Sequence, residues 1–123
     1  MIFWSLLSAV SAAASGGTGS NTTAVRVLLE LDVYPNARCL DGSAGLLYLR
    51  RGWGSGADVW NLFQEGGGSC HSMSDCAHRA TTTQGSSTPW PATIDLEGKG
   101  PYFALNNVTS PLLWNANVAY LVY

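Results

Sequence analysis

A run of glycines near the middle of the chain is the feature that most directly suggests chemistry. Residues 63–70 read FQEGGGSC, so an apolar, strand-like segment ends in three glycines and a cysteine. Glycines let the backbone turn sharply and present consecutive amide N–H groups, which suits binding a negatively charged oxygen. In hydrolases, such a loop supplies oxyanion-hole donors to a serine placed elsewhere. A simple turn is the alternative, since the spacing matches neither G-x-G-x-x-G nor the P-loop.

No serine nucleophile can be assigned beside this glycine run. A G-x-S-x-G segment is absent, because Ser69 is followed two places later by His71 and Ser55 is preceded at that distance by Trp53. Neighbours in sequence rarely face each other as a nucleophile and its base must. We therefore expect a loop serine at 69 and a surface histidine at 71. The second histidine, His78, completes no Ser-His-Asp set either.

The cysteines allow two interpretations. The first is disulfide pairing in an oxidising compartment, which leaves one thiol unpaired among Cys39, Cys70 and Cys76. The alternative is a metal site built from Cys70 and Cys76 with His71 and His78. Its spacing matches no standard zinc pattern, and export favours disulfides, so no metal is expected.

The N-terminus predicts secretion. Residues 1–14 carry no charged side chain and end in small residues, which is typical of a signal peptide cleaved after Ala14; an uncleaved anchor or a buried helix is the alternative. Two N-glycosylation sequons, at Asn21 and Asn107, agree with export. Residues 15–24 (SGGTGSNTTA) are expected to form a flexible leader. After signal removal, no stable membrane insertion is expected.

The composition describes one small domain. The 123 residues carry a net charge of −2, and only 11% are charged, which excludes a nucleic-acid binder that works through bulk positive charge. At 46% hydrophobic residues, the chain can close one core, which we place in residues 25–123.

Short apolar segments bounded by turn residues predict the elements that would position the glycine run. A strand, a glycine turn, a helix and a further strand follow one another, which is the order of an α/β unit. The last strand is expected to leave an unpaired edge, and residues 83–113 are expected to be irregular. The predicted strands cover residues 25–34, 46–50, 59–64 and 118–123, and the predicted helix covers residues 72–82.

Five motifs in one order, with a closing segment, carry a family resemblance. The chain resembles the N-terminal part of the pectin acetylesterase family, which includes the Notum-related carboxylesterases, over about residues 25–123. The motifs are Cys39-Leu40-Asp41-Gly42-Ser43, Gly54-Ser55-Gly56-Ala57-Asp58-x-Trp60, Glu65-Gly66-Gly67-Gly68-x-Cys70, Cys76-x-x-Arg79 and Gly85-Ser86-Ser87, followed by Asn115-Ala116-Asn117-Val118-x-Tyr120-x-x-Tyr123.

The resemblance implies an α/β-hydrolase-like fold, present here as the incomplete N-terminal portion of a mostly parallel sheet. It implies a secreted serine carboxylesterase that needs no cofactor and acts on an acetylated polysaccharide or an acylated protein. The oxyanion donors carry over to the backbone N–H groups of Gly67 and Gly68. The family's nucleophile, acid and histidine lie further along than this chain extends.

The resemblance also assigns the cysteines. Cys70 and Cys76 match a local family disulfide, and Cys39 is expected to pair with a cysteine that follows Tyr123 and is absent here. From the residues themselves, Arg79 is expected to make a structural ion pair with Glu65 or to reach helix-end carbonyls. Trp53, Trp60, Trp90 and Trp114 are expected in the core rather than stacked on sugar rings, and Trp53, in a glycine-rich turn, is the main candidate for a ligand contact.

Three positions depart from the family pattern. Ser69 stands where an aromatic residue is usual, and Asn61 and Gln64 interrupt a strand that should be almost continuously apolar if it is parallel and buried. Three interpretations therefore stay open. The chain is a fragment or truncated product of an active hydrolase, a secreted non-catalytic binding module or pseudoenzyme, or an unrelated disulfide-stapled domain.

Overall fold

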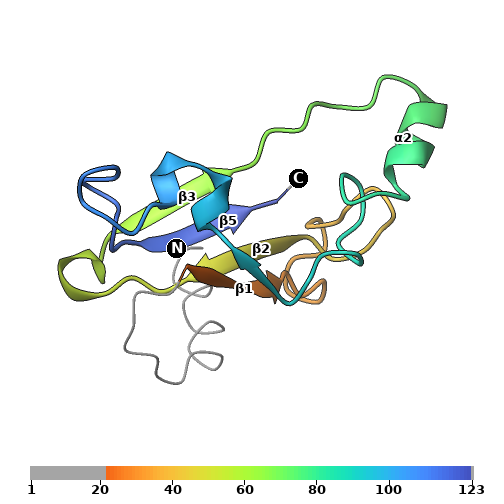
Figure 1. The fold of residues 1–123 in the computed structure, drawn as a ribbon. Coiled ribbons are helices and arrows are strands. Elements are labelled where there is room, and N and C mark those ends of the chain that lie inside the picture. Colours follow the sequence, from red (N-terminus) through yellow and green to blue (C-terminus); the bar gives the residue numbers. More distant parts are fainter. Residues whose placement is uncertain (1–21, 123) are drawn as a thin grey trace.

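The computed structural model describes residues 22–122 as one five-stranded sheet with a short helix and connecting loops (Figure 1). The expected signal peptide, most of the expected leader and Asn21 lie outside these residues. The strands are β1 (Thr23–Leu28), β2 (Leu46–Arg50), β3 (Trp60–Gln64), β4 (Thr93–Asp95) and β5 (Asn117–Leu121); the helix is α2 (Met73–Arg79), and 3-10 turns cover Gly54–Gly56, Glu97–Lys99 and Pro101–Phe103.

The strand order is β3-β5-β2-β1-β4, and the sheet is mixed. β3 and β5 run parallel, joined by the long connection that contains α2, as the α/β order predicts. The other three pairs, β1 with β2, β1 with β4 and β2 with β5, are antiparallel. The expectation of a mostly parallel sheet is therefore corrected within the described residues.

Several element boundaries differ from expectation. β1 begins at Thr23, so the last residues of the expected leader already pair with β4. It ends at Leu28, because the N–H groups of Val33 and Tyr34 both bond the Glu30 carbonyl in a turn. β4 lies inside the segment that was expected to be irregular.

β5 lies in the interior of the sheet, which corrects the prediction of an unpaired edge there. It pairs with β3 on one side and β2 on the other, so the open edges are β3 and β4. Because β3 is an edge strand, it tolerates polar residues. Gln64 is exposed, and the Asn61 side chain, 8% exposed, donates to the Tyr102 carbonyl at 3.1 Å.

One face of the sheet holds the core. The Phe63 and Tyr120 rings stack with centroids 5.7 Å apart, and Phe103 packs edge-on against both. Tyr48 donates its hydroxyl to the Pro91 carbonyl at 2.6 Å. The connection between α2 and β5 therefore covers this face and carries part of the core. The largest fully buried side chains are Tyr48, Tyr120, Phe103, Leu96 and Val118.

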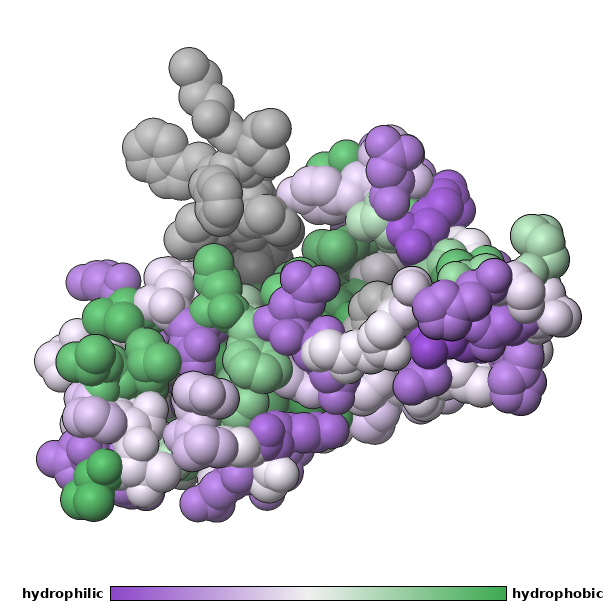
Figure 2. All heavy atoms as spheres, turned by 90° about the horizontal axis from the view of Figure 1, so that it is seen from above, coloured by the Kyte–Doolittle hydropathy of each residue, from purple (hydrophilic) through white to green (hydrophobic). Residues whose placement is uncertain are grey.

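The opposite face, which we call the open face, stays partly exposed. Cross-strand register places Val25, Leu49, Ala119 and Leu62 in one row, with Leu121 beside them. Val25 is 47% and Leu62 is 64% exposed. Figure 2 shows one side of the molecule, on which apolar side chains reach the surface between polar ones. Among residues 22–122, no helix has the length and apolar character needed to cross a membrane.

Arg50, the last residue of β2, is a buried cation. It is 4% exposed, and its Nη1 donates to the Phe103 carbonyl at 3.0 Å. Its Nε and Nη2 atoms are buried and have no hydrogen-bond partner within the described part of the chain. Burial lowers the pKa of this guanidinium. A buried charge without a counter-ion opposes folding.

We therefore expect Arg50→Met to stabilise the chain. The replacement keeps most of the apolar stem and removes the buried charge, and we expect unfolding free energy to rise by about 1–3 kcal/mol. Urea unfolding followed by tryptophan fluorescence at low protein concentration measures this. Arg38→Met is the control, because Arg38 is exposed and its removal relieves no burial. An equal or lower midpoint for Arg50→Met than for the unsubstituted chain would contradict the expectation.

Candidate active-site loop

The glycine run forms an exposed loop that leads from the end of β3 to α2 (Figure 1). The N–H of Glu65 donates to the Leu121 carbonyl at 2.9 Å, so the pairing of β3 with β5 continues to the first residue of the loop. Gly66, Gly67, Gly68 and Ser69 are all exposed. The loop therefore starts from a fixed point on the sheet and reaches into solvent.

The backbone amides of Gly67 and Gly68 are free donors. Neither N–H makes a hydrogen bond with any residue in the range 22–122. Gly68 has φ +76°, a conformation that residues with a side chain rarely adopt. Exposed N–H groups without a partner among the described residues are available to bind an anionic oxygen.

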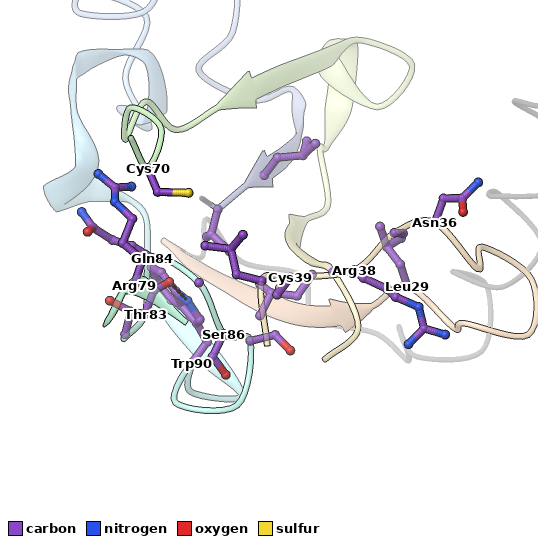
Figure 3. Close-up of a pocket in the computed structure, with 18 of the residues that line it drawn as sticks. Leu29, Asn36, Arg38, Cys39, Cys70, Arg79, Thr83, Gln84, Ser86 and Trp90 are labelled. Atoms are coloured by element: carbon purple, nitrogen blue, oxygen red, sulfur yellow. Dashed lines mark hydrogen bonds between the residues drawn. The ribbon is translucent and has the colours of Figure 1, made fainter. Parts of the chain in front are cut away.

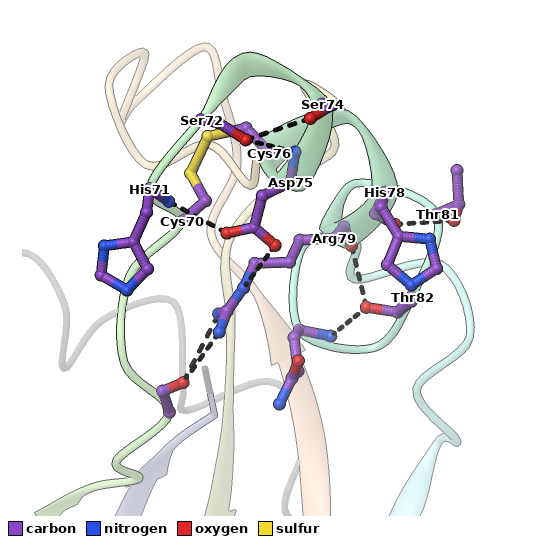
Figure 4. A network of polar contacts seen from close by, with 12 residues as sticks. Cys70, His71, Ser72, Ser74, Asp75, Cys76, His78, Arg79, Thr81 and Thr82 are labelled. Atoms are coloured by element: carbon purple, nitrogen blue, oxygen red, sulfur yellow. Dashed lines mark hydrogen bonds and ion pairs between the residues drawn. A yellow bond between two sulfur atoms is a disulfide. The ribbon is translucent and has the colours of Figure 1, made fainter.

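Arg79 joins the glycine loop to α2. Its Nη1 and Nη2 atoms donate to the Gly67 carbonyl at 3.4 and 3.3 Å, and its Nε lies 4.0 Å from Asp75 Oδ1 (Figure 4). The second Asp75 oxygen accepts the His71 N–H at 2.9 Å. The expected ion pair of Arg79 with Glu65 is therefore wrong: the carboxylate is Asp75, one helical turn earlier, and the carbonyl belongs to the loop. Sequence spacing alone shows the Asp75 pair but not the loop contact.

The helix begins where its sequence predicts. Ser72 is extended, and its Oγ accepts the N–H of Asp75 at 3.1 Å, which caps the first turn. Asp75 lies in the first turn and Arg79 in the last, and both charges interact favourably with the helix dipole at those ends. The helix ends at Arg79, three residues before the expected end, because Thr81 and Thr82 turn back to the carbonyls of His78 and Arg79.

Cys70 and Cys76 form a disulfide, as the family resemblance implied, with Cα atoms 5.1 Å apart. The bond closes the end of the glycine loop onto the first half of α2. It also uses the two sulfur atoms that the alternative metal site needed. His71 and His78 are both exposed, and their rings lie on different sides of the helix region in Figure 4. No hydrogen bond joins Ser69 to His71 within the described residues, so these two do not form a nucleophile and base.

Cys39 is a half-buried free cysteine whose Sγ lies 3.8 Å from the Ala44 carbonyl oxygen. It borders a pocket of about 470 Å³ that Cys70, Arg79, Trp90 and Val122 also line (Figure 3). The pocket thus brings together the unpaired cysteine, the base of the glycine loop and the end of the last strand.

We expect peptide mapping of the isolated chain under non-reducing conditions to find Cys70 joined to Cys76. Cys39 should be recovered as a free thiol or as a mixed disulfide with a small thiol, because no cysteine of this chain remains to pair with it. A peptide that joins Cys39 to Cys70 or Cys76 would contradict this pairing. The same digest after reduction and alkylation serves as the control.

Two other family-like motifs pack against each other beside α2. Asp41 Oδ1 accepts from the N–H and Oγ of Ser43 at 3.0 and 2.6 Å, and the Ser43 hydroxyl accepts the Ser87 N–H at 3.0 Å. Hydrogen bonds from Ser43 and Ser86 lower the pKa of Asp41. At Gly85, an added Cβ would lie 2.4 Å from the Arg79 carbonyl oxygen, so only glycine fits there. This cluster supports the end of α2 that carries Arg79, a role that was not visible in the sequence.

The remaining motifs meet at the opposite end of β5. The Asn115 side chain donates to the Trp53 carbonyl at 2.9 Å, and the Asn117 side chain donates to the Ala57 carbonyl at 2.6 Å. Trp53 packs edge-on against Trp114, with ring centroids 5.7 Å apart. Trp53 is therefore engaged in structural contacts, away from the glycine loop.

The comparisons with known proteins agree on one family. The sequence model of a family described as pectinacetylesterase matches residues 19–123. Pectin acetylesterase 11 of Arabidopsis thaliana is 44% identical over 59 residues, which are 48% of this chain and 15% of that protein. Pectin acetylesterase 4 of the same plant is 47% identical over 51 residues, which are 42% of this chain and 12% of that protein.

Solved structures point the same way. The Wnt deacylase Notum from Drosophila matches in two crystal forms, with TM-scores of 0.63 and 0.64 and sequence identities of 28% and 27%. Each match covers 82% of this chain but only 28% and 27% of Notum. The expected α/β-hydrolase-like fold class is confirmed, and the chain spans less than a third of each of these relatives.

Proposed function

Because the chain belongs to the pectinacetylesterase family, we propose that it forms the N-terminal part of a secreted serine carboxylesterase. In this proposal Gly67 and Gly68 supply oxyanion-hole donors through their backbone N–H groups. The nucleophilic serine, the acid and the histidine lie in polypeptide beyond Tyr123. The observation that carries the proposal is the pair of free, exposed amide donors at the end of β3.

The chemistry follows from the charge that develops during ester hydrolysis. Attack of a serine oxygen on the ester carbonyl moves negative charge onto the carbonyl oxygen. Preorganised N–H donors stabilise that charge, and one such donor contributes about 10²–10³ in kcat. The end of a strand that pairs in parallel, followed by a glycine turn and a helix, is where α/β enzymes place such groups.

An acetylated polysaccharide of the pectin type is the substrate class we favour. The curated relatives at 44% and 47% identity are pectin acetylesterases, whereas the structural match to a Wnt deacylase is at 28% identity. An acylated protein is the alternative substrate. Ser69 is small and exposed, where the family usually has an aromatic residue. It therefore leaves space for a bulky sugar chain beside the N–H groups of Gly67 and Gly68.

Processing and secretion are part of the same proposal. The signal peptide is assigned to residues 1–14 and the leader to the residues between it and β1, which begins at Thr23. Asn107 is exposed, as a glycosylated asparagine must be, and Asn21 is the second proposed glycosylation site. The Cys70–Cys76 disulfide suits an oxidising compartment.

A cysteine that follows Tyr123 is the proposed partner of Cys39. Val122 and Cys39 border the same pocket, which supports a partner that lies just beyond the last strand. A bond there would tie the end of β5 to the loop between β1 and β2 and would leave no thiol unpaired among these cysteines.

The test uses the polypeptide continued beyond Tyr123 by its own coding sequence, which we call the extended polypeptide. It should release acetate from acetylated pectin, and a fluorophosphonate probe should label one serine beyond Tyr123. Activity on an acyl-serine peptide but not on pectin would support the protein-deacylase alternative. A coding sequence that stops at Tyr123, or an extended polypeptide that is neither labelled nor active, would support the non-catalytic module instead.

A further inference from the structure

Arg79 holds the carbonyl of the peptide whose N–H is a proposed oxyanion donor. Its two terminal nitrogens reach the Gly67 oxygen at 3.4 and 3.3 Å. The peptide bonds of the described chain are all trans, and in a trans peptide the C=O and the following N–H point in opposite directions. With the Gly67 carbonyl turned toward Arg79, the Gly68 N–H is therefore turned away from the helix, toward the exposed side of the loop.

Arg79 is itself held in place. Its side chain is 18% exposed, and Asp75 lies on the same helix face with its carboxylate 4.0 Å from Nε. Asp75 is anchored in turn by the His71 N–H, and Gly85 packs directly on the Arg79 carbonyl. The disulfide fixes the loop to the same helix. Figure 4 shows the Arg79 guanidinium between the Asp75 carboxylate and the loop carbonyl.

The guanidinium also changes the strength of the donor. A charged donor on the carbonyl oxygen polarises the peptide, which makes its N–H a stronger hydrogen-bond donor. A lysine would supply the charge but not the planar fork that reaches both Asp75 and the loop.

We propose that Arg79 is a positioning residue that orients and polarises the Gly67–Gly68 peptide so that the Gly68 N–H faces the reacting ester oxygen. This inference rests on the proposed function and adds to it a residue that touches neither the substrate nor the reacting atoms. Loss of Arg79 should weaken binding of the transition state while leaving binding of the substrate nearly unchanged.

The experiment compares Arg79→Gln and Arg79→Lys in the extended polypeptide. For Arg79→Gln, we expect kcat to fall about 10- to 100-fold with KM changed less than about threefold, because a misdirected donor loses part of the contribution of one oxyanion contact. Affinity for a boronic acid that mimics the tetrahedral intermediate should fall in parallel with kcat. Arg79→Lys should recover only part of the rate.

The matched control is Arg38→Gln. Arg38 also donates its guanidinium to backbone carbonyls, those of Pro35 and Gly42 at 3.0 and 3.2 Å, but these belong to another loop. It should keep the wild-type kcat. If Arg79→Gln fails to fold, Arg79→Lys carries the same comparison.

Three results would overturn the inference, and failure of the positioning role is distinguishable from failure of the proposed function. An active wild type whose Arg79 variants keep kcat and boronate affinity would overturn the positioning role alone. Equal losses in substrate and boronate affinity would do the same, because they indicate general damage to the site. An inactive wild-type extended polypeptide would overturn the proposed function, and the role of Arg79 with it.

Discussion

The isolated 123-residue chain is expected to hydrolyse p-nitrophenyl acetate no faster than a heat-treated control. It presents free donors at Gly67 and Gly68 but holds no G-x-S-x-G serine, and its Ser69 and His71 do not form a hydrogen-bonded pair in the described structure. Serine hydrolases that lose their nucleophile keep only the part of the rate that the oxyanion hole and substrate binding provide. The extended polypeptide should be faster by a factor on the order of 10³ or more.

The measurement is initial-rate spectrophotometry of both polypeptides at equal concentration. Ser69→Ala in the isolated chain is the control, because it removes the one hydroxyl that lies beside the glycines. Turnover by the isolated chain that exceeds the heated sample and disappears in Ser69→Ala would contradict the account. It would mean that this chain carries its own nucleophile.

Self-association of the isolated chain is the second large effect we expect. The open face exposes Val25 on β1 and Leu62 on β3, and β3 is an edge strand among the described strands. An exposed apolar strand at a sheet edge is a template for pairing with another chain. Size-exclusion chromatography with light scattering should therefore find oligomers or aggregates at micromolar concentration.

Leu62→Lys tests the cause of this association. Leu62 is 64% exposed on the edge strand, so a lysine there adds charge to both the face and the edge without disturbing the core. It should shift the chain toward monomer, whereas Val108→Lys, which adds the same charge on an exposed turn outside the strands, should not. A monomeric, cooperatively unfolding parent chain would contradict the account and favour a complete, non-catalytic small domain.

Local features of the fold could be predicted from the sequence because local residues determine them. β2 occupies the expected residues, and the Ser72 cap places the start of α2. Burial alternates along β2 because successive side chains of a strand point to opposite faces of the sheet. The disulfide was implied by the family resemblance rather than by spacing.

Long-range pairings could not be predicted in the same way. Strand direction depends on which strands meet, and a sequence pattern of period two is the same for parallel and antiparallel neighbours. β4 was missed because three residues of a polar segment form a strand only through their pairing with β1. The interior place of β5 likewise depends on β3 and β2, which come much earlier in the chain.

The glycine run could be recognised in the sequence as a motif, but the side chains that hold its loop in place could not. The Arg79 contact with Gly67 joins the end of α2 to a residue of the preceding loop, 12 positions earlier in the chain, so no helical spacing indicates it. The Asp41 and Ser43 cluster was visible only as part of the family resemblance, without a role. Asp75, one turn before Arg79, was the available signal, since it predicts an ordered arginine at the end of the helix.

The most direct test of the central claim is an NMR measurement of the glycine amides. The extended polypeptide, labelled with ¹⁵N-glycine, is compared before and after reaction with a phosphonate that mimics the tetrahedral intermediate. The account predicts that the amide protons of Gly67 and Gly68 shift downfield and become protected from exchange, whereas that of Gly54, in the turn at the opposite end of β5, does not change. Full inhibition by the phosphonate with unchanged Gly67 and Gly68 amides would show that these groups do not bind the oxyanion.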